Sequence, residues 1–475
     1  MQTTYYPTIG LEIHAELTTK SKMFCGCKND PDETTPNANV CPVCMGHPGT
    51  LPYPNFEAIK HVLKVGIALD GTLADFTEFD RKNYFYPDIP KGYQISQAKY
   101  PFVTGGNLEG VAITRVHLEE DTAKSGHETG DYSLVDFNRS SLPLMELVTE
   151  PVIHDAKTAG NFARELQLLL RYLGASEANM EKGQMRVEAN ISISPEEGKL
   201  GTKVEVKNLN SFRSVERAIE YEIERHKALL EAGEEIKQET RGFDETTGKT
   251  FSQRSKEDAH DYRYFPEPDI PKMYISEIPE FELETLKKEM PELPKEKRVR
   301  YANEYKIKSD DIEVFVQNPT LATFFERAIS NFCDDTSCIQ LASNYMISDL
   351  MGLMKAEGRE DVGALFPSSF GELMLLLKEG KISSRGAKDL LALMYKEGGE
   401  NPEKIAEEKG WILKDDPELL KRILVDIMSK NQKSVEEYRS GKENALNALI
   451  GQAMKESKGA FSPQTIKEGL IEILK

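Results

Sequence analysis

Histidine and glutamate alternate in the segment EIHAE at residues 12–16, near the start of the chain. Residues two positions apart on a β-strand point to the same side, so a strand here would group the polar side chains on one face. Two further acidic segments follow, HLEED at 117–121 and a segment around Glu146. Carboxylate oxygens, sometimes with an imidazole, bind hard cations such as Mg²⁺ and leave positions for a phosphate-bearing substrate. The three segments are therefore candidates for a cation site, although each one alone is more typical of a solvated face.

Four cysteines form two close pairs, Cys25-Gly-Cys27 and Cys41-Pro-Val-Cys44, with thirteen residues between them. Two such thiolate pairs can fill the four corners of a tetrahedral zinc site. The intervening segment, KNDPDETTPNANV, has no hydrophobic core of its own, so a metal would order it. Four thiolates leave no open position on the metal, which favours a structural role over a catalytic one. The alternative is four unrelated buried thiols.

Aromatic and basic residues are interleaved between Asp80 and Gln97, where Arg81, Lys82 and Lys91 lie among tyrosines and prolines. Such a segment can stack bases or bind phosphate, but it is equally typical of a packed loop. The sequence DYRYFPEPDIP, beginning at Asp261, has the same character.

One glycine-rich segment, GFDETTGKT beginning at Gly242, resembles a nucleotide-binding P-loop and is rejected as one. Five residues separate its glycines where the P-loop has four, and Asp244 and Glu245 would repel phosphates. GxSxG and GxGxxG motifs are not found either, so the sequence does not indicate a serine hydrolase or a dinucleotide-binding fold.

The elements predicted around these motifs change along the chain. Short alternating stretches at 111–114, 189–193 and 204–206 predict strands. Apolar residues at helical spacing predict one helix that stops at Gly174 and a second that follows Ser214, a candidate N-cap.

After the Pro-rich stretch that ends near residue 294, every apolar pattern is helical. We expect an α+β fold with three domains: a β-rich domain with an antiparallel sheet and flanking helices at 1–291, an all-α domain at 292–402, and a small all-α tail at 403–475.

The composition, 39% hydrophobic and 29% charged over 475 residues, is that of an ordinary globular protein. The net charge of −19 argues against nonspecific binding to nucleic acid or to an anionic membrane. The tail 401–475 is neutral, however, so an RNA contact would be least opposed there. We find no signal peptide and no membrane span, and the few cysteines indicate a reducing compartment. We therefore expect a cytoplasmic protein without a membrane contact.

Taken together, the motifs resemble the B-subunit family of the aspartyl/glutamyl-tRNA(Asn/Gln) amidotransferases, and the resemblance runs nearly end to end. It rests on IGLEIHAEL, CPVCMGHPGTLP, FDRKNYFYPDIPKGYQISQ, RVHLEEDTAKS, DFNRSSLPLMELVTEP, EKGQMRVEANISI, TKVEVKNLNSFRSVERAIEYEIERH and DYRYFPEPDIP. Two segments depart from the usual sequence of the family. Val-Glu replaces Cys-Asp in MRVEANISI, and Ser140-Ser141-Leu142 replaces Gln-Gly-Thr or Gln-Gly-Val.

The resemblance implies an ATP-dependent carbon–nitrogen ligase that takes its amide nitrogen from glutamine. An amidase A subunit releases ammonia, a small C subunit holds the two larger subunits together, and the B subunit recognises misacylated Glu-tRNA(Gln) or Asp-tRNA(Asn). The B subunit phosphorylates the side-chain carboxylate with ATP, ammonia displaces the phosphate, and the helical tail contacts the tRNA. Which of the two tRNAs is used, and whether the cation is Mg²⁺ or Mn²⁺, stay open.

The resemblance also assigns site residues. They are His14, Glu119 and Glu146 as Mg²⁺ ligands, with Glu12 and Glu120 adjoining; Arg81 and Lys82 at the phosphates; Lys91 and Glu120 at an ammonia exit; and Cys25, Cys27, Cys41 and Cys44 as ligands of structural Zn²⁺. Two other readings remain: a noncatalytic, zinc-stabilised RNA-binding adaptor, and a metallohydrolase, which the lack of a second histidine near metal-ligand spacing disfavours.

Overall fold

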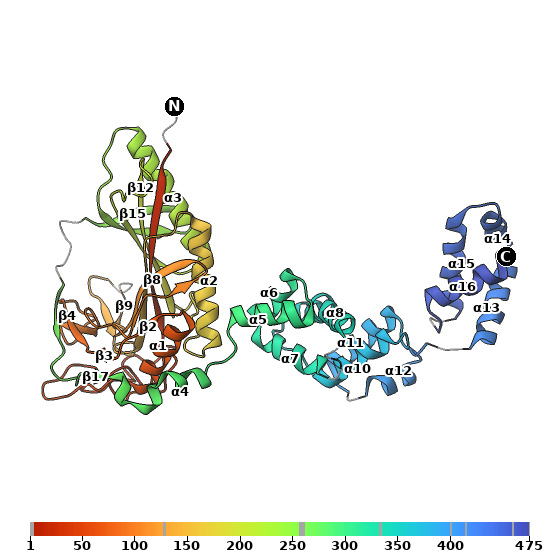
Figure 1. Ribbon diagram of the computed structural model, residues 1–475, viewed down its shortest axis with the longest axis horizontal. Helices are drawn as coiled ribbons and strands as arrows, with labels where there is room; N and C mark the ends of the chain where they lie inside the picture. The colour runs from red at the N-terminus through yellow and green to blue at the C-terminus, as the bar shows by residue number, and fades with distance from the viewer. Residues whose placement is uncertain are drawn as a thin grey trace. The chain divides into compact units, whose positions relative to one another are not determined.

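The structure is a computed structural model, and it describes residues 4–126, 130–255, 262–330, 332, 335–399, 401–413, 416–457 and 460–474. The chain divides into two compact units, Met1–Pro294 and Lys295–Lys475. The first unit carries all of the named strands and the second is helical (Figure 1). The predicted α+β class is confirmed.

The strands of the first unit are β1 (Tyr6–Glu16), β2 (Thr72–Leu73), β3 (Phe76–Thr77), β4 (Asp80–Asn83), β5 (Tyr93–Ser96), β6 (Val103–Thr104), β7 (Asn107–Leu108), β8 (Val111–Glu120), β9 (Lys124–Gly126), β10 (Leu134–Asp136), β11 (Pro143–Thr149), β12 (Met185–Ser194), β13 (Val204–Leu209), β14 (Glu239–Asp244), β15 (Lys249–Ser255), β16 (Arg263–Pro266) and β17 (Met273–Tyr274). Its helices are α1 (Phe56–Ala68), α2 (Ala156–Tyr172), α3 (Phe212–Glu231) and α4 (Leu283–Lys288).

Ten strands form one large sheet in the order β15-β14-β13-β12-β1-β11-β8-β6-β2, with β7 paired to β8 off this path. Its neighbours are antiparallel except β13 and β14, which run parallel. The central strand β1 pairs with β12 on one side and β11 on the other. Strands far apart in the sequence therefore meet at the EIHAE segment.

The two faces of the sheet differ because side chains alternate along each strand. On β1, Ile9, Leu11 and Ile13 are almost fully buried and belong to a hydrophobic core that includes Leu166 of α2 and Ile219 of α3. In Figure 1, α2 and α3 lie along one side of the large sheet. The opposite face carries the polar residues of the alternation, and the candidate site is on that face.

Helix ends follow local capping chemistry. Helix α2 begins after Asp155, whose side chain accepts a hydrogen bond from the backbone N–H of Thr158. Helix α3 begins after Ser211, which accepts from Ser214 N. The predicted N-cap Ser214 is therefore wrong by one turn, because Ser211 is the residue with extended backbone that precedes the first helical turn.

The second unit consists of α5 (Pro294–Arg300), α6 (Ser309–Gln317), α7 (Pro319–Ile329), α8 (Thr336–Asn344), α9 (Met351–Glu357), α10 (Pro367–Lys378), α11 (Ser384–Glu397), α12 (Pro402–Lys409), α13 (Pro417–Lys430), α14 (Gln432–Arg439), α15 (Glu443–Glu456) and α16 (Pro463–Leu474). Helix α12 packs on α10 and α11, and α13–α16 share a hydrophobic core of their own. By these contacts, α12 belongs with the helices before it, although the sequence placed it in the tail domain.

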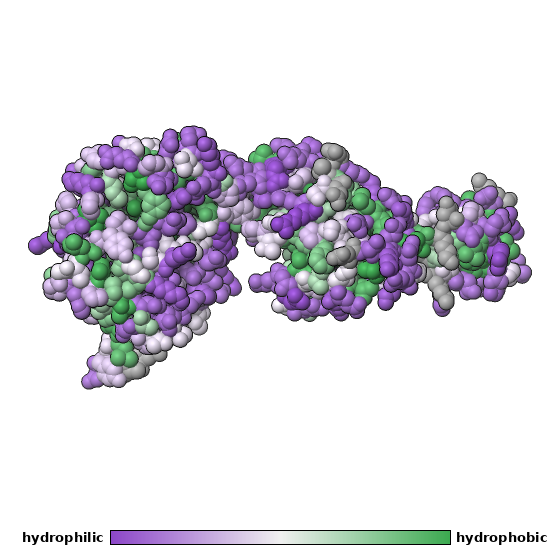
Figure 2. Space-filling model, turned by 90° about the horizontal axis from the view of Figure 1, so that it is seen from below, coloured by the Kyte–Doolittle hydropathy of each residue, from purple (hydrophilic) through white to green (hydrophobic). Residues whose placement is uncertain are grey.

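Hydrophilic residues cover most of the face of each unit that Figure 2 shows, with smaller apolar areas between them. No helix in the described part of the chain has the length and apolar character needed to cross a membrane.

Candidate functional site

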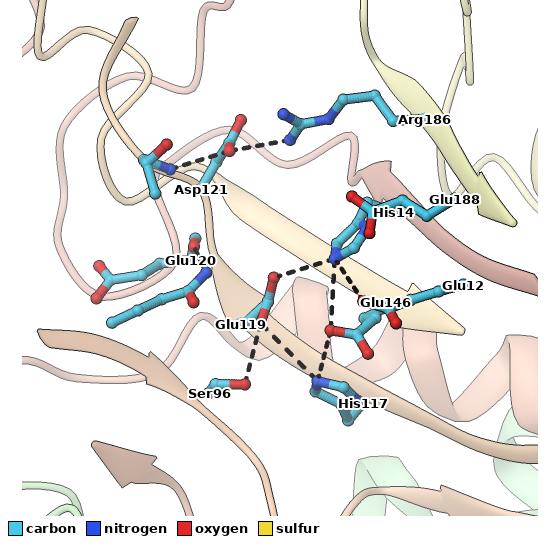
Figure 3. Close-up of polar contacts among 12 residues, drawn as sticks. Glu12, His14, Ser96, His117, Glu119, Glu120, Asp121, Glu146, Arg186 and Glu188 are labelled. Carbon is cyan, nitrogen blue, oxygen red and sulfur yellow. Dashed lines mark hydrogen bonds and ion pairs between the residues drawn. The ribbon is translucent and has the colours of Figure 1, made fainter. Parts of the chain in front are cut away.

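The register of the large sheet brings all three acidic segments together. His14 of β1 is directly opposite Glu146 of β11, and Glu146 is in turn opposite His117 of β8. Glu119 follows His117 by two positions and points to the same face. Three strands thus place two histidines and two carboxylates on one face of the sheet (Figure 3).

Distances within this group are short. His14 Nε2 lies 3.4 Å from Glu146 Oε2, 3.6 Å from Glu119 Oε1 and 4.0 Å from Glu12 Oε1. His117 Nε2 lies 3.4 Å from Glu146 Oε2 and 3.9 Å from Glu119 Oε2. We call His14, His117, Glu119 and Glu146 the histidine–carboxylate cluster.

Burial and like charge shape the electrostatics of this cluster. Burial opposes ionisation of Glu146, but His117 and His14 outweigh it and hold the pKa of Glu146 well below its ordinary value. For Glu12, burial and the neighbouring charges of Glu146 and Glu188 act together and raise its pKa to about 7. Several carboxylates therefore lie close together on the polar face of the sheet, and positively charged partners are needed to stabilise their ionised forms.

The donor atoms of the cluster fit a divalent cation. Ligands about 2.1 Å from an octahedral ion lie about 3 Å apart when adjacent and about 4.2 Å apart when opposite. The separations between the imidazole nitrogens and the carboxylate oxygens, 3.4–3.9 Å, lie between these two values, so small movements of the side chains would bring them onto one ion. Donor atoms of Glu12, His14 and Glu146 all lie within 4.8 Å of one another, as do those of His117, Glu119 and Glu146.

Glu120 lies away from this cluster, although it is next to Glu119 in the sequence. Its Oε2 accepts a hydrogen bond of 2.6 Å from Lys91 Nζ, and its Oε1 accepts one of 2.9 Å from Ile95 N. The structure therefore brings Lys91 and Glu120 together, as a buried ion pair on the other side of β8.

Arg81 and Lys82 are neighbours on β4 and also point in opposite directions. Arg81 forms a bidentate pair with Glu267, contacts Asp269 and stacks on the ring of Tyr93. These contacts occupy its guanidinium between β5 and the segment that follows β16.

Lys82 faces the histidine–carboxylate cluster, and its ammonium lies 4.8 Å from the ring of Tyr262. Burial alone would lower the pKa of Lys82, but nearby carboxylates, Glu119 first, raise it above its ordinary value. Lys82 thus supplies a positive charge on the side of the cluster. The aromatic segment DYRYFPEPDIP contributes Tyr262 here; its first residue, Asp261, lies outside the described residues.

Sequence reasoning did not assign a role to several charged residues on the same face. His117 was visible only as part of an acidic segment, while Arg186 and Glu188 of β12 oppose His14 and Glu12 of β1. The alternation in RVHLEE and MRVEANIS is a signal that could have identified them, because it places charged residues at every second position.

The four cysteines, which we call the cysteine quartet, also come together. Donor sulfurs of Cys25, Cys27, Cys41 and Cys44 all lie within 4.8 Å of one another, and the Cys41 and Cys44 sulfurs are 3.9 Å apart. In a tetrahedral zinc site with Zn–S bonds of about 2.3 Å, sulfurs lie about 3.8 Å apart. The separation of the Cys41 and Cys44 sulfurs matches this value, and all four sulfurs are close enough together to surround one ion.

A buried lysine accompanies the thiols. The side chain of Lys22 is fully buried and donates a hydrogen bond of 3.2 Å to the carbonyl of Phe137. Hydrogen bonding from Cys25 is the main cause that lowers the pKa of Cys44 to about 5, and Lys22 acts in the same direction. A thiolate at Cys44 is the protonation state that a metal ligand needs.

Comparisons with known proteins identify the family. The sequence matches the family described as "GatB/GatE catalytic domain" over residues 7–279 and the "GatB domain" over residues 323–474. Relatives named as B subunits of aspartyl/glutamyl-tRNA(Asn/Gln) amidotransferases include that of Persephonella marina, 43% identical over 99% of this chain and 100% of the relative. Those of Thermotoga petrophila (45%, covering 97% of each chain) and Thermodesulfovibrio yellowstonii (42%, covering 99% of each) are similar. The chain therefore belongs to the B-subunit family of the aspartyl/glutamyl-tRNA(Asn/Gln) amidotransferases.

Proposed function

We propose that this chain is the subunit of a tRNA-dependent amidotransferase that binds misacylated tRNA and activates its carboxylate with ATP. The substrate is Glu-tRNA(Gln), Asp-tRNA(Asn) or both. The observation that carries the proposal is the histidine–carboxylate cluster on the polar face of the sheet, whose donor set suits a cation that handles phosphate. The relatives are named as B subunits of aspartyl/glutamyl-tRNA(Asn/Gln) amidotransferases, which supports a role in tRNA-dependent amide transfer.

The chemistry explains why ATP is needed. A carboxylate is a poor acyl donor because its leaving group would be oxide. When a carboxylate oxygen attacks the γ-phosphorus of ATP, ADP leaves and an acyl phosphate forms. The nitrogen of ammonia then attacks the acyl carbon, phosphate leaves, and the amide remains on the tRNA.

The residues of the chain must bring two anions together. His14, Glu119 and Glu146 would hold a divalent cation, Mg²⁺ or Mn²⁺, with Glu12 beside them. Such a cation, when bound, neutralises charge between the triphosphate and the substrate carboxylate. Lys82 adds a second positive charge on the same side of the sheet, which makes it the better candidate for phosphate contact than Arg81, whose guanidinium is paired with Glu267.

The remaining assignments concern assembly. We propose that the cysteine quartet binds zinc for stability, because four sulfur ligands leave no site for substrate. Ammonia would come from glutamine on a separate amidase A subunit, and a small C subunit would complete a heterotrimer in the cytoplasm. The helical tail would contact the tRNA.

The test is ammonia-dependent amidation without glutamine. The chain is reconstituted with A and C subunits, Glu-tRNA, ATP, Mg²⁺ and ammonium, and ADP release and Gln-tRNA formation are followed. Glu146→Ala is expected to lower the rate about 10²–10³-fold, by analogy with other electrostatic groups in active sites. Glu197→Ala, a change at an exposed residue after β12, is the matched control and is expected to leave the rate unchanged.

Two results would contradict the proposal. If Glu146→Ala is as active as the wild type, the cluster is not the activation site. If the wild type binds Glu-tRNA but releases no ADP, the chain is the noncatalytic, zinc-stabilised RNA-binding adaptor instead.

A further inference from the structure

The end of β8 is joined to β5 without regular strand pairing. Among the described strands, β5 pairs with β4, and β8 pairs with β6, β7 and β11. Side chains make the connection instead, in three successive hydrogen bonds: Leu118 N to Gln97 Oε1 (3.0 Å), Ser96 Oγ to Glu119 Oε2 (3.0 Å), and Ile95 N to Glu120 Oε1 (2.9 Å). The position of Glu119, a proposed cation ligand, therefore depends on how β5 is held.

Glu120 is the central link in this connection. Besides the bond from Ile95, its backbone carbonyl accepts a hydrogen bond of 2.7 Å from Gln94 Nε2. Its carboxylate pairs with Lys91 at 2.6 Å, and the exposed fractions of the two side chains are only 3% and 8%. A buried carboxylate that loses its paired cation is strongly destabilised, so Lys91 keeps Glu120 in place.

The segment that follows the cysteine quartet lies directly on Lys91. Gly46, two residues after Cys44, has a φ of +68°, which disfavours a side chain. A Cβ atom at Gly46 would lie 2.5 Å from Cγ and 3.2 Å from Cα of Lys91. Two reasons therefore favour glycine at this position: the positive φ and the close approach to Lys91. Gly46, which belongs to the segment that carries Cys41 and Cys44 (the cysteine segment), packs against the aliphatic part of the lysine that pairs with Glu120.

We propose that Lys91 and Glu120 are positioning residues that connect the cysteine segment to Glu119. The chain of contacts runs from Gly46 to Lys91, from Lys91 to Glu120, and from Glu120 through β5 to Ser96, which donates to Glu119. This inference rests on the proposed cation site of His14, Glu119 and Glu146. It gives the buried ion pair a role in cation binding, in addition to the place at an ammonia exit that the resemblance implies.

The size of the effect follows from known metal sites. Groups that orient a metal ligand through hydrogen bonds typically change metal affinity about 10–100-fold when they are removed. Lys91 acts through Glu120 and β5, so we expect the lower end of this range. A residue with only a structural role would instead change the melting temperature and leave the cation affinity of the folded protein unchanged.

The test measures Mn²⁺ binding to the zinc-loaded full-length chain, by the electron paramagnetic resonance signal of free Mn²⁺. Lys91→Met and Gly46→Ala are each expected to weaken Mn²⁺ binding about 10-fold. Lys91→Arg keeps the positive charge and is expected to retain most of the affinity. Lys64→Met is the matched control, because it also removes a largely buried lysine from an ion pair, with Glu289, outside the proposed chain of contacts.

Melting curves identify the variants that are folded before their affinities are compared. If Lys91→Met does not fold, Gly46→Ala decides, because it keeps the charges of Lys91 and Glu120 and all four thiols. Wild-type affinity in a folded Lys91→Met or Gly46→Ala protein would overturn the inference and leave the proposed function intact. If the wild type itself binds no Mn²⁺, both the cation site and this inference fail.

Discussion

His14 and Glu146 face each other directly across the pairing of β1 with β11, and His14 Nε2 lies 3.4 Å from Glu146 Oε2. The pair joins the first and third acidic segments of the sequence at the centre of the large sheet. Because strands hold both backbones, neither side chain needs a loop to position it. Such rigid placement suits a cation site, in which the distances between donor atoms decide affinity.

Replacing His14 tests whether its imidazole is a ligand of the proposed cation. His14→Ala is expected to lower the rate of Gln-tRNA formation about 10²–10³-fold at low Mg²⁺. Part of the activity should return as the Mg²⁺ concentration rises, since the remaining carboxylates still attract the ion. The measurement is the initial rate against Mg²⁺ concentration. His154→Ala, at an exposed residue, serves as the control. If the two variants show the same dependence of initial rate on Mg²⁺ concentration, His14 is not a ligand of the cation.

The cysteine quartet predicts one zinc ion per chain. Cys44→Ser should lose that ion, measured by atomic emission spectroscopy, and should unfold at a lower temperature. Zinc at about 1,000 times its dissociation constant stabilises the folded state by about 4 kcal/mol, and this contribution would be lost. Cys338→Ser is the control, because Cys338 is buried in α8 and is not part of the quartet. Wild-type zinc content in Cys44→Ser would show that the quartet is not the zinc site.

A buried ionic network predicts the acid sensitivity of the first unit. Glu222 of α3 is fully buried; its carboxylate pairs with Arg225 at 2.7 Å and Arg241 at 3.2 Å, and it accepts a hydrogen bond from Thr250. Burial opposes its ionisation, but His226 first, and then Arg225 and Thr250, lower its pKa from 4.5 to about 2. The ionised form therefore stabilises the fold.

This stabilisation is complete above about pH 4.5 and is lost as the pH falls toward 2. The difference between the two pKa values corresponds to about 3 kcal/mol. Glu222→Gln should be less stable at pH 6 and should lose less stability than the wild type between pH 5 and pH 2.5, as measured by urea unfolding. Parallel pH curves for the two proteins would contradict the role of Glu222.

Ser141 is a site where a substitution should stabilise the protein. Its φ is +68°, and its buried hydroxyl has no hydrogen-bond partner among the described residues. Ser141→Gly removes both costs and should raise the free energy of unfolding by about 1 kcal/mol. The resemblance to the family also gives glycine as the usual residue at this position.

Ser140→Gly is the matched control for this change. Ser140 is buried next to Ser141, but its φ is not positive, so glycine there only adds flexibility to the unfolded chain. We expect Ser140→Gly to lower the free energy of unfolding by about 1 kcal/mol. Equal effects of the two substitutions, measured by urea unfolding, would show that backbone conformation is not the cause.

Several elements could be predicted because their signals are local. Alternation predicted strands where β8, β12 and β13 lie, and helical spacing predicted α2 and α3. The cysteine spacing predicted that four sulfurs would converge, and they do. Each of these features depends on residues that are near one another in the chain, or on an arrangement that one ion can impose.

Adjacent residues were harder to separate. The sequence placed Glu120 with Glu119 and Arg81 with Lys82, but in each pair the two side chains point to opposite sides of a strand. Glu119 belongs to the histidine–carboxylate cluster and Lys82 lies beside it, whereas Glu120 pairs with Lys91 and Arg81 pairs with Glu267. A sequence motif assigns adjacent residues to one site, but in a β-strand the side chains of adjacent residues lie on opposite sides.

The order of residues is thus sufficient for the α+β class, for the polar face of β1 and for the four-sulfur site. It does not reveal that His117 joins His14 at Glu146, because that depends on which strands pair and in which register. Nor does it reveal that Gly46 touches Lys91. Periodicity records which side of an element is buried, but the partner of that side is chosen by packing between distant segments, which no local pattern encodes.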